Sequence, residues 1–143
     1  MKLKSYIFYI LVFLPFVVYT QVPVFKQLKN LPDVEFYDVV EDQQHYIWLA
    51  ADKGLFRYNG KEYENFNHPE QKSNSLFQLK FDTNGNLWCN NIYGQIFYVE
   101  DDSLNLFYDA SKLVKGQLAP YEILENHIRL FTINGIYNID KST

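Results

Sequence analysis

Histidine is the side chain that most often does chemistry near neutral pH, and this sequence has three: His45, His68 and His127. A metal-binding role needs a second histidine or a carboxylate at ligand spacing on the same element. The sequence shows no such spacing around any of them, and each falls in or beside a turn. We therefore predict exposed turn residues and no metal site.

The run Asp82-Thr83-Asn84-Gly85-Asn86 spaces its polar side chains as a calcium-binding loop does. The glycine and the distal bidentate glutamate of such a loop are missing at the required offsets, so a β-turn is the better interpretation. The adjacent acids Asp101 and Asp102 fall in a predicted hairpin turn, where we expect them to be solvated. The sequence also lacks the glycine-rich and serine motifs of nucleotide-binding enzymes and hydrolases. We expect no catalytic residues, no cofactor and no enzymatic activity.

The single cysteine, Cys89, excludes an internal disulfide and a cysteine-based metal cluster. It follows Trp88 in a predicted strand, where a thiol usually acts as a small buried hydrophobe. Trp48 and Trp88 recur at the same place in a repeated pattern, which indicates packing in the core. A sugar-stacking aromatic would instead be expected on a loop.

Two landmarks recur along the chain at one spacing. Trp88 follows Trp48 by 40 positions, and Arg129 follows Trp88 by 41. The same two intervals separate three glycines: Gly54, Gly94 and Gly135. Separate landmarks that keep one spacing indicate a structural repeat of about 40 residues.

Each repeat contains short runs of aromatic and β-branched residues between polar or glycine-containing turns, a pattern typical of β-strands. The aromatic content of 18% also favours β-structure. No long stretch keeps a 3.6-residue period, so helix should be minor, and only residues 109–116 suggest a short helical turn. The predicted strands are 22–28, 36–40, 46–51, 54–58, 61–66, 75–81, 87–90, 94–99, 104–108, 121–125, 128–133 and 135–139.

Four short antiparallel strands per repeat predict an all-β fold built from the blades of a partial β-propeller. The domain is predicted over residues 21–143, with blades at about 34–66, 75–108 and 120–143. A two-sheet sandwich is the alternative, but the constant spacing of the landmarks favours blades. Three blades do not close a ring, because propellers typically have roughly four to eight. Either the chain is the N-terminal piece of a longer protein or several copies assemble, and open strand edges would favour self-association.

The N-terminus has the pattern of an export signal. Two lysines precede an apolar run from Ile7 to Val18, and Thr20 supplies a small residue before a cleavage site. We predict a cleavable signal peptide over residues 1–20. A retained membrane helix is the alternative, but the 14 residues from 6 to 19 are fewer than the about 20 that span a bilayer.

Without the leader the chain has 11 basic and 17 acidic side chains, a net charge of −6. It contains no run of Lys or Arg that could follow a phosphate backbone, so nucleic acid is not an expected partner.

The first repeat contains Ile47-Trp48-Leu49-Ala50-Ala51, Gly54-Leu55 and Arg57-Tyr58-Asn59-Gly60, and with these residues it resembles the two-component regulator propeller repeat family. The last of these ends in Asn-Gly, a strong hairpin signal, because both residues tolerate positive φ. The repeat-defining structural residues are Trp48, Gly54, Tyr58, Gly60, Trp88, Gly94 and Gly135.

The later repeats are similar to the same family, with departures. The second matches through Asn84-Gly85-Asn86-Leu87-Trp88 and Gly94, but has Gln95 where a hydrophobic residue is usual. The third keeps Asn134-Gly135-Ile136 and has Arg129 in place of the tryptophan.

The resemblance implies the sensor region of a bacterial membrane histidine kinase, truncated before further blades, a membrane span and the kinase. Many members of the family occur in gut and marine bacteria that sense polysaccharide fragments, and the resemblance therefore implies an oligosaccharide or another small ligand. We therefore expect an exported, periplasmic segment that binds a ligand and passes the signal to the downstream blades and signalling domains of a longer chain. A scaffold for protein–protein interaction with no small ligand is the alternative. The missing acid–base residues argue against a propeller-fold hydrolase or lyase. The sequence identifies no ligand-binding residues.

Overall fold

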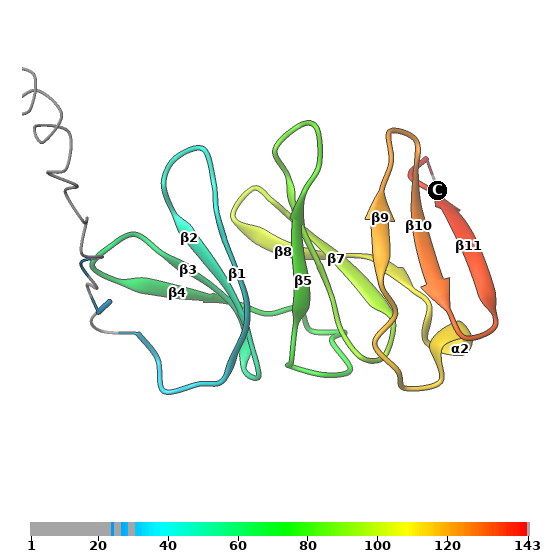
Figure 1. Ribbon diagram of the computed structural model, residues 1–143, viewed down its shortest axis with the longest axis horizontal. Helices are drawn as coiled ribbons and strands as arrows, with labels where there is room; N and C mark the ends of the chain where they lie inside the picture. The colour runs from blue at the N-terminus through cyan, green and yellow to red at the C-terminus, as the bar shows by residue number, and fades with distance from the viewer. Residues whose placement is uncertain (1–23, 25–26, 29–30, 143) are drawn as a thin grey trace, which may run out of the picture.

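The computed structural model describes residues 24, 27–28 and 31–142, and their regular secondary structure is β-strand apart from one short helix (Figure 1). Three antiparallel sheets of four, four and three strands follow one another along the chain. The first sheet contains β1 (Phe36–Glu41), β2 (Ile47–Ala51), β3 (Gly54–Tyr58) and β4 (Tyr63–Phe66). The second contains β5 (Phe77–Phe81), β6 (Leu87–Asn90), β7 (Gln95–Glu100) and β8 (Ser103–Asp109). After the short helix α2 (Ser111–Val114), the third contains β9 (Tyr121–Ile123), β10 (His127–Thr132) and β11 (Gly135–Asp140).

The predicted all-β class is confirmed, and most strand boundaries lie within two residues of those predicted. The strand predicted from residue 61 begins only at Tyr63, because Asn59 extends the preceding turn. The Asn59 side-chain oxygen accepts the backbone N–H groups of Lys61 and Glu62 at 2.9 and 2.8 Å. Such an Asx turn competes with strand pairing over these residues.

Two predictions concern the N-terminal part of the chain. The signal peptide predicted at residues 1–20 lies outside the described residues. Of the strand predicted at residues 22–28, only Val24, Gln27 and Leu28 are described, and these three are not in a strand. Within the described residues, no helix is long and apolar enough to cross a membrane.

Alternating residues of each central strand face opposite ways, which gives the fold a core between each pair of neighbouring sheets. In β2, Trp48 and Ala50 pack against the second sheet, whereas Leu49 and Ala51 face the other side and contact Leu31 and Val34. The core between the first and second sheets contains Trp48, Ala50, Leu55, Phe66, Leu76, Leu79, Leu87, Cys89, Phe97 and Leu104. The core between the second and third sheets contains Trp88, Ile96, Ala110, Val114, Ala119, Tyr121, Ile128, Leu130 and Ile139.

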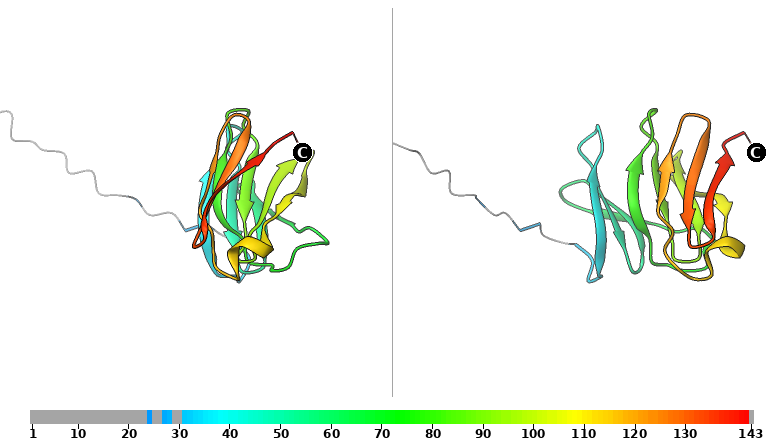
Figure 2. Two further views of the ribbon diagram at one scale, coloured as in Figure 1. Left: turned by 90° about the vertical axis from the view of Figure 1, so that its right-hand side faces the viewer. Right: turned by 45° about the vertical axis from the view of Figure 1, so that its right-hand side comes forward.

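The sheets meet through their first strands, β1, β5 and β9, which run side by side (Figures 1 and 2). The Leu79 N–H of β5 donates to the Asp38 carboxylate of β1 at 2.8 Å. The Tyr121 hydroxyl of β9 donates to the Gln78 carbonyl of β5 at 2.7 Å. These bonds join successive sheets at their first strands, in addition to the cores packed between the sheets.

Gln95 departs from the hydrophobic pattern because it anchors a connector. Its side chain is fully buried. The amide oxygen accepts the Lys72 N–H at 2.7 Å and the Asn91 side-chain N–H at 2.9 Å, and its NH₂ donates to the Glu70 carbonyl at 2.9 Å. A buried amide with both groups satisfied is stable, and here it fixes the connector between the first two sheets to β7.

Gly94 lies where a side chain would not fit. Its φ is +74°, and a β-carbon at this position would lie 2.6 Å from the Val114 Cγ2 of α2. The turn before β7 therefore requires glycine on both conformational and steric grounds.

Candidate ligand-binding site

Two turns of the same construction stand at one end of the first and second sheets. In each, one carboxylate oxygen of an aspartate accepts the N–H groups two and four residues later, all at 2.9 Å. The other oxygen accepts the indole N–H of a tryptophan six residues later. The distance is 2.8 Å from Trp48 Nε1 to Asp42 and 3.0 Å from Trp88 Nε1 to Asp82. Each aspartate thus fixes a turn to the core beneath it.

The residue that closes each turn has a left-handed backbone. Gly85 has φ of +87° and His45 has φ of +65°. Glycine adopts this conformation without cost, whereas histidine does so with strain. The exposed His45 ring pairs with Glu41, with Nδ1 2.5 Å from the carboxylate.

The hydrogen bonds at Asp82 decide its charge. Partial burial disfavours the carboxylate, but the bonds donated by Trp88, Asn86 and Asn84 outweigh it, and the pKa of Asp82 is lowered. Asp82 is therefore ionised at neutral pH and does not serve as a general acid.

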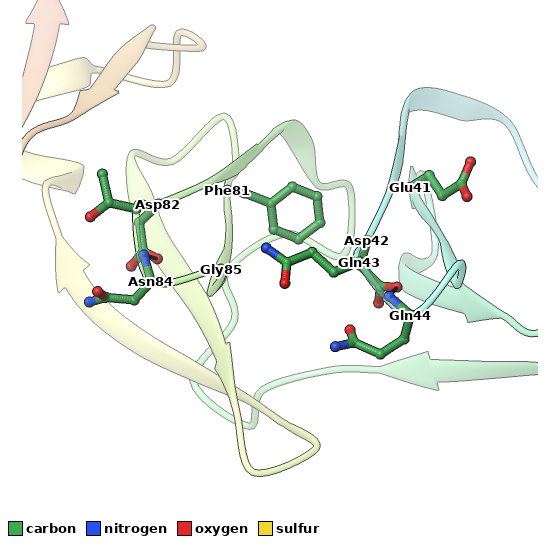
Figure 3. A pocket seen from close by; sticks show the side chains of 9 residues that line it. Glu41, Asp42, Gln43, Gln44, Phe81, Asp82, Asn84 and Gly85 are labelled. Carbon is green, nitrogen blue, oxygen red and sulfur yellow. Dashed lines mark hydrogen bonds between the residues drawn. The ribbon is translucent and has the colours of Figure 1, made fainter.

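A pocket of about 230 Å³ lies between these two turns (Figure 3). Its lining consists of Glu41, Asp42, Gln43, Gln44, Phe81, Asp82, Thr83, Asn84 and Gly85. The Phe81 ring is half-buried between the turns, with the Gln43 amide beside it, and the Asn84 side chain points away from Gln43 in this view (Figure 3). Within the described residues, the side-chain amides of Gln43, Gln44 and Asn84 make no hydrogen bond, so they are available to a ligand.

A wider groove of about 550 Å³ adjoins this pocket and runs towards the turn between β7 and β8. Arg57 lies in it, over the rings of Tyr46 at 5.1 Å and Trp48 at 5.3 Å. Its guanidinium donates to Glu64 on β4 and to Asp102 in the β7–β8 turn, each at 2.6 Å. Arg57 thus links the first sheet to the second across the groove.

The site offers binding groups. The pocket and groove present free amides, exposed carboxylates and aromatic rings. Among the described residues, no group of three or more His, Cys, Asp or Glu side chains is placed to hold a metal ion. The arrangement can exchange hydrogen bonds with a polar ligand and pack an apolar face of it against Phe81 or Tyr46.

Several candidate residues lie where the sequence indicates. Trp48 and Trp88 are 4% and 5% exposed and belong to the cores, and Cys89 is buried beside them. Burial raises the pKa of the Cys89 thiol, so it is unreactive. The Tyr58 hydroxyl donates to the Gly60 carbonyl at 2.8 Å and closes the turn before β4. The repeated glycines all have positive φ: Gly54, Gly60, Gly94 and Gly135.

Other expectations need correction. His45 is exposed in its turn as predicted, but His68 and His127 are half-buried. His68 lies against the Phe97 ring with centroids 6.0 Å apart, and His127 is the first residue of β10. Asp102 is exposed but does more than contact solvent, because it accepts a hydrogen bond from Arg57. Arg57 and Asp102 are 45 positions apart in the sequence, and no local sequence pattern predicts their contact.

No family model matches the chain. A search of the curated proteins finds no match either.

Proposed function

We propose that this chain is a ligand-binding segment of an exported, propeller-type sensor, and that it acts by binding and not by catalysis. The three sheets would be blades, and β1, β5 and β9 would be their innermost strands. The shared edge of these strands and the 40-residue repeat both support this arrangement. The export pattern of residues 1–20 supports a periplasmic location.

The pocket between the Asp42 and Asp82 turns is the observation that carries the binding role. Its walls are built by hydrogen bonds that the fold itself satisfies, so the turns are preorganised before a ligand arrives. The amides of Gln43, Gln44 and Asn84 each offer both donors and an acceptor. Hydroxyl groups of a neutral sugar fit this inventory, and the half-buried Phe81 ring suits the apolar face of a sugar ring.

A thermal-shift screen tests this proposal. Neutral cello-, xylo- and manno-oligosaccharides would be added to the purified chain at increasing concentration. A ligand that binds only the folded state raises the melting temperature in proportion to the logarithm of its concentration. A rise of this logarithmic form with one of these sugars is the expected result. Absence of any shift would favour the scaffold alternative. Cell fractionation with N-terminal sequencing, expected to start at Gln21 in the periplasm, tests the location.

A further inference from the structure

The described part of the chain contains three Asn-Gly pairs, and each asparagine lies in an exposed turn between two strands. The pairs are Asn59-Gly60, Asn84-Gly85 and Asn134-Gly135. Asparagine before glycine is prone to lose its side-chain amide, because glycine has no β-carbon to shield its backbone nitrogen. Since the three sites share this dipeptide, the fold decides which of them reacts in the native protein.

The reaction is an intramolecular substitution. The glycine nitrogen gives its proton to hydroxide and attacks the side-chain Cγ of the asparagine, a C–N bond forms, and the amide nitrogen takes up a proton and leaves as ammonia. Water then opens the cyclic succinimide at either of its carbonyls, which yields aspartate or isoaspartate. The amide must rotate until its carbon faces the glycine nitrogen, so hydrogen bonds that hold either group slow the reaction.

The Asn59 amide is held by the backbone that follows it. Its oxygen accepts the N–H groups of Lys61 and Glu62 at 2.9 and 2.8 Å. Rotation of the amide towards the Gly60 nitrogen breaks both hydrogen bonds. The first sheet's Asn-Gly pair is therefore protected.

The Asn134 pair is restrained at both reacting groups. The Asn134 NH₂ donates to the Leu113 carbonyl of α2 at 3.3 Å. The nitrogen that would attack belongs to Gly135, the first residue of β11, which pairs with Thr132 across the hairpin. This pair is protected as well.

The Asn84 side chain is free to rotate. It is exposed and makes no hydrogen bond within the described residues. One restraint remains, because the Gly85 N–H donates to the Asp82 backbone carbonyl at 3.1 Å. This bond lies in an exposed turn, where local opening costs little free energy.

We propose that Asn84 is a site of spontaneous modification, at which the folded protein converts asparagine to aspartate or isoaspartate faster than at the other two Asn-Gly pairs. The product adds a negative charge two residues from Asp82. Isoaspartate also lengthens the backbone by a methylene group between Asp82 and Asn86, whose N–H donates to the Asp82 carboxylate at 2.9 Å. The isoaspartate form should therefore loosen the turn that is bonded to Trp88. The reaction needs no ligand, so it is independent of the proposed binding role.

Peptide mapping by mass spectrometry tests the site. The purified chain is incubated at mildly alkaline pH, beside a sample held unfolded in guanidinium chloride, and a sample digested without incubation gives the background. Trypsin places the three pairs on separate peptides, 58–61, 81–112 and 130–141, because each of these ends in lysine. An isoaspartyl methyltransferase assay on the intact chain measures isoaspartate independently. Asn84→Gln is the matched variant, since glutamine keeps the amide but closes a larger ring far more slowly.

We expect the native chain to lose the Asn84 amide about tenfold faster than that of Asn59 or Asn134, because those amides must first break hydrogen bonds. In denaturant the three rates should be similar, and Asn84→Gln should remove most of the native isoaspartate signal. Loss at Asn59 or Asn134 that equals or exceeds loss at Asn84 in the native chain would overturn the proposal. An Asn84 that stays intact in the native chain while the unfolded chain reacts would overturn it too.

Discussion

The hydrogen bond between Asp82 and Trp88 should hold the second sheet's turn to its core, and Asp82→Ala removes it. Trp88 is 5% exposed, so its indole N–H loses a partner that water replaces poorly. An unsatisfied buried donor costs about 1–3 kcal/mol. The N–H groups of Asn84 and Asn86 lose their acceptor as well, but they are closer to solvent. We expect a total loss of about 2–4 kcal/mol, in line with hydrogen bonds to charged groups.

The assay is urea unfolding followed by tryptophan fluorescence, together with thermal melting. For a domain of this size the loss corresponds to a fall of roughly 8–16 °C in melting temperature. Thr83→Ala, an exposed change in the same turn, is the control and should stay near the wild type. A loss below about 0.5 kcal/mol in Asp82→Ala would refute the reasoning.

Asp82→Asn separates the indole bond from the turn bonds. Its remaining oxygen can still accept the turn N–H groups, while its NH₂ cannot accept from Trp88. The pKa of Asp82 is lowered in the folded state. Its stabilisation is therefore present above the unfolded pKa of about 3.9 and is lost as pH falls through the folded pKa. The stability difference between wild type and Asp82→Asn should thus be largest at neutral pH and shrink in acid. A difference that grows on acidification would contradict this.

Three further predictions test the packing. Gly94→Ala should cost about 2–4 kcal/mol in urea unfolding, because it adds both left-handed strain and a clash with Val114. Gly60→Ala has nothing within 4 Å of the new β-carbon and should cost less, so equal losses would count against the clash. Gln95→Leu should cost about 2–4 kcal/mol by stranding the buried polar groups that the amide satisfies, and a neutral result would show that the connector needs no anchor. The Cys89 thiol should react with a thiol reagent only after denaturation, and rapid reaction in the native protein would contradict its burial.

The strands were predictable because their signals are local. Alternating aromatic and aliphatic residues, and turns such as Asn59-Gly60, act over a few positions. The Asp–Trp bond also has a local signal, since both aspartates precede their tryptophans by six positions, although its meaning emerges only in three dimensions.

The site depends on contacts between repeats. The pocket forms because two turns 40 positions apart stand side by side, and the groove because Arg57 reaches Asp102. The sequence shows Gln95 as a departure from the hydrophobic pattern of its strand. The three groups that its amide hydrogen-bonds, however, lie on the connector between the sheets and in the turn before β7. Side-chain partners at such separations follow from sheet packing and not from local periodicity.

Calorimetric titration of the chain with the neutral oligosaccharide that shifts its melting most tests the binding role directly. The variant that combines Gln43→Ala with Asn84→Ala removes free amides from both walls of the pocket and should leave stability unchanged, because neither amide is bonded within the described residues. Gln117→Ala, an exposed amide outside this pocket, is the matched control. We predict at least about a tenfold weaker affinity for the double variant, or about 1.4 kcal/mol, and wild-type affinity for the control. Equal affinity in all three proteins would contradict a binding site between the Asp42 and Asp82 turns.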